Sequence, residues 1–96
     1  MQTFVMLSTL GPDGFATLLE SPDRLAAVRA DAEAMGVEIV AQYAMLGEWD
    51  FLTIVKAEDP AAMSRMATTL AARGTMRTRT ISAIDADEYV AALGAT

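Results

Sequence analysis

The feature that most constrains the fold of this chain is a strand–helix pattern that occurs once in each half. Residues 21–36, SPDRLAAVRADAEAMG, and residues 59–74, DPAAMSRMATTLAARG, carry the same signals in the same order. Each segment begins with a residue that can cap a helix, continues with proline at the first helical position and ends at glycine. Apolar side chains recur within each at spacings of three and four residues, which predicts two amphipathic helices.

The ends and apolar faces of the two helices follow from these signals. Ser21 is the predicted N-cap of the first helix and Gly36 its C-terminal cap, while Asp59 and Gly74 occupy the corresponding positions of the second. The predicted apolar stripes consist of Leu25, Val28, Ala32 and Met35 in the first helix and of Met63, Met66 and Leu70 in the second.

Four runs rich in β-branched and aromatic residues surround the helices and predict strands. They cover residues 3–10, 37–46, 49–57 and 75–84. The first run ends at Gly-Pro-Asp-Gly, which predicts a loop over residues 11–14. Only Gly47 and Glu48 separate the second and third runs, which predicts a two-residue hairpin with a type II′ turn.

The resulting order of elements is β-α-β-β-α-β, followed by a short helix over residues 85–93 that Asp85 could cap. Two β-α-β halves of this kind are typical of the split β-α-β, or ferredoxin-like, arrangement. We therefore predict an α+β fold in one domain, residues 1–96, with a four-stranded antiparallel sheet that carries both helices on one face.

The predicted strands do not alternate between apolar and polar residues, as a sheet with one wet face would require. In the third strand, Trp49, Phe51 and Val55 point to one face and Leu52 and Ile54 to the other. The first strand opposes Phe4 and Met6 to Val5 and Leu7, and the second opposes Ile39 and Tyr43 to Val40 and Leu46. Because each buried apolar side chain contributes about 1.5–3 kcal/mol, we expect a second copy of the sheet to cover the open face. This predicts a homodimer or a larger homo-oligomer.

Composition excludes several classes of function. Thirteen acidic residues against seven basic ones give a net charge of −6, which argues against a nucleic-acid binder. The chain has no histidine and no cysteine, so we expect no metal site and no cofactor. The opening residues 1–14 lack the positive and continuous apolar regions of a signal peptide or membrane span, and we expect a cytoplasmic protein without a membrane partner.

The segment LGEWDFLTIV, residues 46–55, resembles the G-x-Y-D motif of the GYD-domain family of small bacterial proteins of unassigned function. The opening FVMLSTLGPDG, the first helix and the strand MRTRTISAI are also similar to that family. Trp49 stands where the family usually has tyrosine, whereas Gly47 and Asp50 match the motif. The family is similar in architecture to the dimeric α+β barrels, in which two ferredoxin-like sheets face each other. This resemblance implies self-association and ligand pockets between a sheet and its helices or loops.

Candidate ligand-binding residues lie around the predicted hairpin and on the strands beside it. Trp49 could form an aromatic wall, and the carboxylate of Asp50 could carry a proton, which makes it the one weak catalytic candidate. Either residue could instead serve the hairpin alone, the indole as a core side chain and the carboxylate as a partner of backbone amides. The predicted ligand-binding set is Trp49, Asp50, Phe51, Tyr43, Met6, Arg77 and Arg79.

Arg77 and Arg79 share one face of the last strand, where they could bind a ligand carboxylate or simply discourage strand pairing at an edge. Three functions remain open on these grounds. The first is a homo-oligomeric domain that binds a small apolar or aromatic acid near the Trp49 hairpin. The second is a cofactor-free oxygenase or isomerase acting on an acidic aromatic substrate. The third is a purely structural assembly module.

Overall fold

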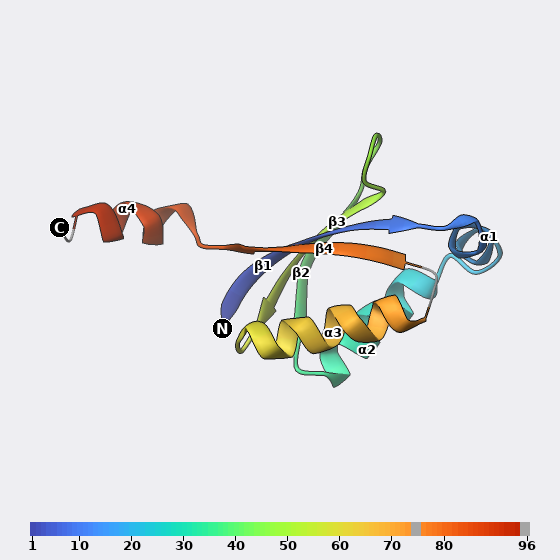
Figure 1. The fold of residues 1–96 in the computed structure, drawn as a ribbon, viewed down its shortest axis with the longest axis horizontal. Coiled ribbons are helices and arrows are strands. Elements are labelled where there is room, and N and C mark those ends of the chain that lie inside the picture. The colour runs from blue at the N-terminus through green and yellow to red at the C-terminus, as the bar shows by residue number, and fades with distance from the viewer. Residues whose placement is uncertain (74–75, 95–96) are drawn as a thin grey trace.

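The computed structural model describes residues 1–73 and 76–94, and it contains one antiparallel sheet with the strand order β2-β3-β1-β4. The strands are β1 (Gln2–Leu10), β2 (Glu38–Ala44), β3 (Phe51–Ala57) and β4 (Met76–Ala83). The helices are α1 (Pro12–Glu20), α2 (Arg24–Ala34), α3 (Pro60–Ala72) and α4 (Ala86–Gly94). Figure 1 shows α2 and α3 on one face of the sheet, with α1 and α4 at opposite ends. The predicted ferredoxin-like arrangement is confirmed, with α1 and α4 added to it.

Helix α3 forms as its sequence predicts. The Asp59 side chain accepts a hydrogen bond from the Ala62 N–H at 2.9 Å, and Pro60 is the first helical residue. This satisfies one of the amide groups that a helix start leaves without an intrahelical partner. The predicted stripe of Met63, Met66 and Leu70 is buried against the sheet. The predicted cap at Gly74 lies outside the described residues.

Residues that we expected to form a loop instead form helix α1. Gly11 is its N-cap and Pro12 its first residue, so the proline of Gly-Pro-Asp-Gly starts a helix and does not mark a turn. Ser21 ends this helix, with its N–H donating to the Thr17 carbonyl at 2.9 Å, and α2 begins only at Arg24. The prediction that Ser21 caps the start of the next helix is therefore wrong.

Helix α2 ends at the predicted glycine. Gly36 has a φ of +78° and its N–H donates to the Glu33 carbonyl, while the Val37 N–H reaches back to the Ala32 carbonyl at 2.9 Å. This pair of bonds is a Schellman motif, in which a left-handed residue lets the chain leave the helix without unpaired carbonyl groups. The motif turns the chain directly into β2.

The hairpin between β2 and β3 is wider than the predicted two-residue turn. The Met45 N–H donates to the Asp50 carbonyl at 2.7 Å, which leaves the four residues 46–49 in the loop. Gly47 adopts a φ of +111° within it. Asp50 lies within the predicted third strand but precedes β3 in the structure. Its N–H donates to the Ser8 carbonyl, which holds it at the end of β1.

A bulge in β2 changes which residues face the helices. Ile39 is paired with Val55 and Ala41 with Ile54, so Val40 has no opposite residue in β3. Beyond the bulge, Tyr43 pairs with Leu52 and therefore lies on the open face. The prediction that Ile39 and Tyr43 share a face is wrong, because one extra residue reverses the alternation.

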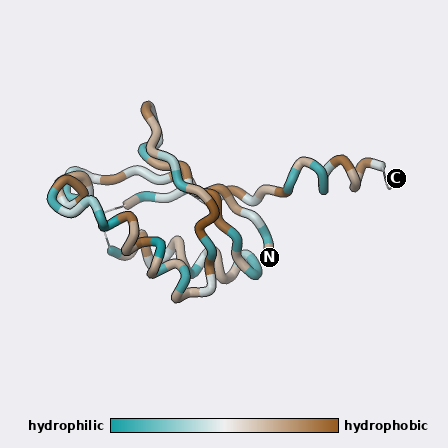
Figure 2. Tube along the Cα trace, turned by 180° about the vertical axis from the view of Figure 1, so that it is seen from behind, coloured by the Kyte–Doolittle hydropathy of each residue, from teal (hydrophilic) through white to brown (hydrophobic). Residues whose placement is uncertain are grey.

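Both faces of the sheet carry apolar residues, as predicted. The helix-facing side forms the core, whose buried sheet residues include Phe4, Met6, Ile39, Phe51 and Val55. On the opposite side Val5, Leu7, Leu52 and Ile54 are only partly buried, and Tyr43 is 58% exposed. Figure 2 shows hydrophobic residues, coloured brown, along the central strands of the sheet. No helix in the described part of the chain covers this open face.

Candidate ligand pocket

A mainly apolar pocket lies between the helix-facing side of the sheet and the helices α1 and α2. The pocket has a volume of about 70 Å³ for the centres of water-sized molecules. A water molecule needs about 10–15 Å³ of such space, so the pocket can take several waters or one end of a small organic molecule. Its apolar wall includes Leu10 and Ile39 from the sheet, Leu18 and Leu25 from the helices, and Met66 from α3.

Two rows of cross-strand neighbours form the floor of the pocket. Thr53 lies between Gln42 of β2 and Met6 of β1, and all three line the pocket. One step along β3 toward the hairpin on the same face, Phe51 is paired with Ser8. The floor thus places two hydroxyls and one carboxamide among apolar groups.

The Thr53 hydroxyl has no hydrogen-bond partner, although its side chain is only 1% exposed. A buried hydroxyl without a partner costs about 1–3 kcal/mol. Because this oxygen is buried, a ligand would remove that cost only with a polar atom that reaches it through the pocket wall. Thr80 also has an unpartnered buried hydroxyl, but it is not among the pocket-lining residues.

The helical side of the pocket was missed by sequence reasoning. Helix α1 contributes Gly14, Thr17 and Leu18, and the exposed side chain of Arg24 at the start of α2 lies at the pocket rim. Three local signals could have revealed this helix. They are the proline directly after Gly11, the acid at the next position and the leucines near the end of the segment. Its role in the pocket depends on how it packs, which no local pattern encodes.

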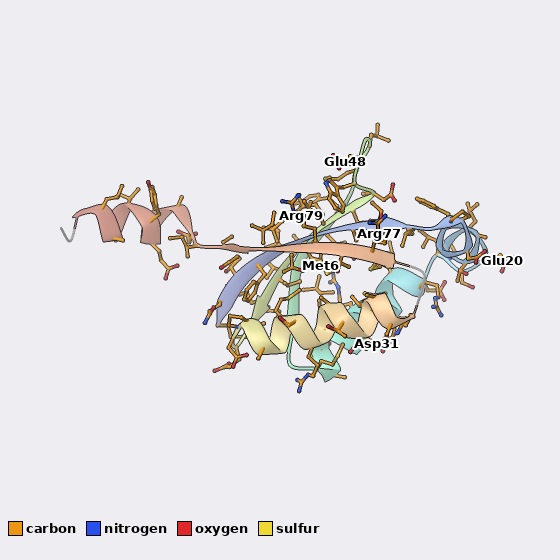
Figure 3. All side chains as sticks on the ribbon, in the orientation of Figure 1. Met6, Glu20, Asp31, Glu48, Arg77 and Arg79 are labelled. Carbon is orange, nitrogen blue, oxygen red and sulfur yellow. The ribbon has the colours of Figure 1, made fainter. Side chains whose placement is uncertain are left out.

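The structure separates the predicted ligand-binding residues. Met6 and Phe51 lie together in the pocket. Tyr43 pairs with Leu52, and Arg79 with Leu7, so both lie on the open face, as does Arg77. Figure 3 shows Met6 on the helix side of the sheet and the two arginines on the opposite side. One ligand in the pocket cannot touch both groups, because the sheet stands between them.

The pocket lining places a few hydrogen-bonding groups among apolar side chains. No histidine or cysteine is present in the chain, and the described residues contain no cluster of three or more acidic side chains that could hold a metal ion. The lining residues offer hydroxyls, a carboxamide and a guanidinium group, and they include no carboxylate. Nor does any helix in the described residues have the length and apolarity that crossing a membrane requires.

Comparison with known proteins places the chain in a family. The model of the GYD domain matches residues 4–93. The chain belongs to the GYD-domain family. A relative from Thermus thermophilus, named glutamine synthetase and cystathionine beta-lyase binding protein, is 45% identical over 94 residues, which are 97% of this chain and 99% of the relative.

Two solved structures resemble the GYD domain described above. One is FFRP-DM1, with a TM-score of 0.59, 20% identity and coverage of 88% of this chain and all of the other. The second is TTHA0845 from Thermus thermophilus, with a TM-score of 0.57, 20% identity and coverage of 90% and 96%. At this level of identity the likeness establishes the fold alone.

The motif that suggested the GYD family belongs to the hairpin and not to the pocket wall. The Asp50 carboxylate accepts a hydrogen bond from the Leu10 N–H at 2.9 Å, which agrees with the alternative that this acid is a partner of backbone amides. Trp49 is partly buried in the hairpin loop, and neither residue lines the pocket. Because its carboxylate binds a backbone amide, Asp50 acts here as a brace between β1 and the hairpin.

Proposed function

We propose that this GYD-domain protein is a small binding module that holds a small carboxylic acid with an apolar body between the sheet and helices α1 and α2. The observation that carries this proposal is the unpartnered hydroxyl of Thr53 in an apolar pocket. A ligand that bonds this hydroxyl removes the cost of leaving it unpaired. Arg24 at the rim suits the carboxylate, because guanidinium groups bind carboxylates with two parallel hydrogen bonds.

The dimensions of the pocket favour small ligands. A volume of about 70 Å³, which holds roughly five to seven waters, suits a short aliphatic chain or a single ring, not a large planar cofactor. Apolar residues on both the sheet and the helices would enclose this part of the ligand. Thr53 and Gln42 then offer hydrogen bonds to a second polar group on the ligand.

Calorimetric titration with short aliphatic carboxylates, benzoate and phenylacetate tests the proposal. We expect wild-type protein to bind at least one of them, and Thr53→Val to weaken that binding about tenfold, the effect of losing one or two hydrogen bonds. Thr80→Val is the matched control, because it removes the other unpartnered hydroxyl without touching the pocket.

Two results would contradict the proposal. One is a wild-type protein that binds none of these acids at millimolar concentration. The other is an equal loss of binding in Thr53→Val and Thr80→Val. Phenylacetamide adds a check on Arg24, since it keeps the ring but lacks the charge, and we expect it to bind more weakly than phenylacetate.

We further propose that the protein self-associates through the open face of the sheet. Support comes from the apolar side chains on that face, with Tyr43 58% and Ile81 46% exposed. An exposed patch of this kind on a small domain is characteristic of an interaction surface. A sheet-to-sheet dimer leaves the ligand pocket accessible on the opposite, helix-covered side.

The Thermus relative supports a second function, binding to enzymes. Its name assigns it glutamine synthetase and cystathionine beta-lyase as binding partners, and it aligns with this chain over nearly the full length of both. We propose that this chain also binds enzymes of that kind. Sedimentation of the protein with each purified enzyme tests this directly, and separate boundaries at micromolar concentrations of both components would contradict it.

A further inference from the structure

Helix α4 carries apolar side chains that are exposed in the single chain. None of its nine residues is buried, and Tyr89 and Val90 are 54% and 62% exposed. Figure 1 shows the helix projecting beyond the end of the sheet, away from the other helices. A helix of this length is marginal in water by itself, because helix formation must overcome a costly first turn. Its apolar residues therefore require a second surface.

Charges on α4 and on the open face of the sheet are complementary. Asp87 and Glu88 lie exposed in the first turn of α4. Arg77 and Arg79 are exposed on β4, and neither forms an ion pair within the described residues. The two arginines lie toward the start of β4, which pairs with the end of β1 just before α1 begins.

We propose that α4 of one copy packs against the α1 end of a second copy. Asp87 and Glu88 then lie next to Arg77 and Arg79 of the partner subunit. Tyr89 and Val90 cover apolar residues of α1 in that subunit. Helix α1 supplies a matching surface, because Phe15 is 42% and Leu19 84% exposed. This inference rests on the self-association through the open face proposed above.

The position of α4 makes this contact possible in a symmetric dimer. Helices α1 and α4 lie at opposite ends of the sheet, with β1 and β4 running between them (Figure 1). A two-fold axis that runs across the strands, between two facing sheets, places α4 of each copy over the α1 end of the other. An axis along the strands instead places α4 over α4 and brings like charges together, which disfavours that arrangement.

A charge-exchange experiment with two variants tests the proposal. The first variant carries Asp87→Lys and Glu88→Lys, and the second carries Arg77→Glu and Arg79→Glu. We expect each variant alone to dimerise about tenfold more weakly than wild type in sedimentation equilibrium, the effect of opposing two pairs of partly exposed charges at each of the two contacts. An equimolar mixture should form heterodimers with close to wild-type affinity, because both contacts in the mixed dimer join opposite charges. Arg29→Glu and Glu33→Lys are control reversals at exposed positions of α2.

The outcomes separate this inference from the proposed self-association. A wild-type monomer would overturn both. A wild-type dimer whose affinity is unchanged in either variant would overturn the placement of α4 and leave the sheet-to-sheet dimer standing. If each variant is weakened but the mixture shows no recovery, the charges act within one chain and the exchange between copies is wrong. A lysine variant that dimerises like wild type by itself but more tightly when mixed with wild type, without any effect of the glutamate variant, would instead indicate an α4-to-α4 contact. Circular dichroism of each variant verifies that it is folded.

Discussion

At the residue scale, two threonines each bury a hydroxyl that has no hydrogen-bond partner, at different positions in the sheet. The hydroxyls of Thr53 and Thr80 are both buried without a partner, but only Thr53 lines the pocket. Replacing either by valine removes a polar group that the folded protein does not satisfy. We expect each substitution to raise the free energy of unfolding by about 1 kcal/mol, measured by urea denaturation. A loss of stability would mean that the hydroxyl is hydrogen-bonded in solution.

A second residue-scale prediction concerns the brace at Asp50. Its carboxylate accepts from the Leu10 N–H at 2.9 Å, where the end of β1 meets the hairpin. Asp50→Ala leaves that partly buried amide without its acceptor, and we expect a loss of about 1–3 kcal/mol in the free energy of unfolding. Asp50→Asn keeps a side-chain oxygen that can accept the same bond, so it should lose less. Equal losses in the two variants, determined by urea denaturation, would show that the charge matters more than the hydrogen bond.

At the scale of elements, the sequence was sufficient where a local signal and the packing agree. A single helix on one face of the sheet accounts for the cap at Asp59, for Pro60 at the helix start and for the buried methionine stripe of α3. The failures occurred where one local pattern supports two structures. Proline after Gly11 is compatible with a turn and with a helix start, and only the packing of α1 at the end of the sheet decides between them. The bulge at Val40 likewise has no local marker, and it moved Tyr43 away from the predicted site.

The glycine that ends α2 gives an element-scale prediction. Gly36 has a φ of +78°, and a β-carbon there would meet no atom within 4 Å, so any cost of substitution is conformational. We expect Gly36→Ala to lower the free energy of unfolding by about 1 kcal/mol, because alanine is strained in the left-handed region. Gly94→Ala is the control, since Gly94 is equally uncrowded but does not have a positive φ. Thermal unfolding of the two variants measures the difference, and equal midpoints would contradict the assignment of strain to Gly36.

At the scale of the whole molecule, hydrophobic patterning predicted the two apolar faces but not the division of the candidate site between them. The alternation of Phe51 and Leu52 along β3 placed one in the core and the other on the open face, as expected from strand geometry. The pocket under the sheet required α1, which was not anticipated. Consequently the proposed ligand and the proposed second copy occupy opposite faces of one sheet, and each can be perturbed without the other.

Leu52 is the position at which this separation is most directly tested. It lies on the open face between Tyr43 of β2 and Leu7 of β1, and it is only partly buried in the single chain. Glutamate there would reach solvent in a monomer, but in a sheet-to-sheet dimer it would be an unpaired buried charge costing several kcal/mol.

We therefore expect Leu52→Glu to remain folded by circular dichroism, to sediment as a monomer at micromolar concentration and to retain carboxylate binding. Arg29→Glu, on the exposed side of α2, should leave the oligomer intact. A Leu52→Glu variant that still sediments as the wild-type oligomer would show that the open face is not the interface. One that loses both folding and association would show that the single chain does not fold without its partner, because the side chain faces away from the helices and should not disturb the core.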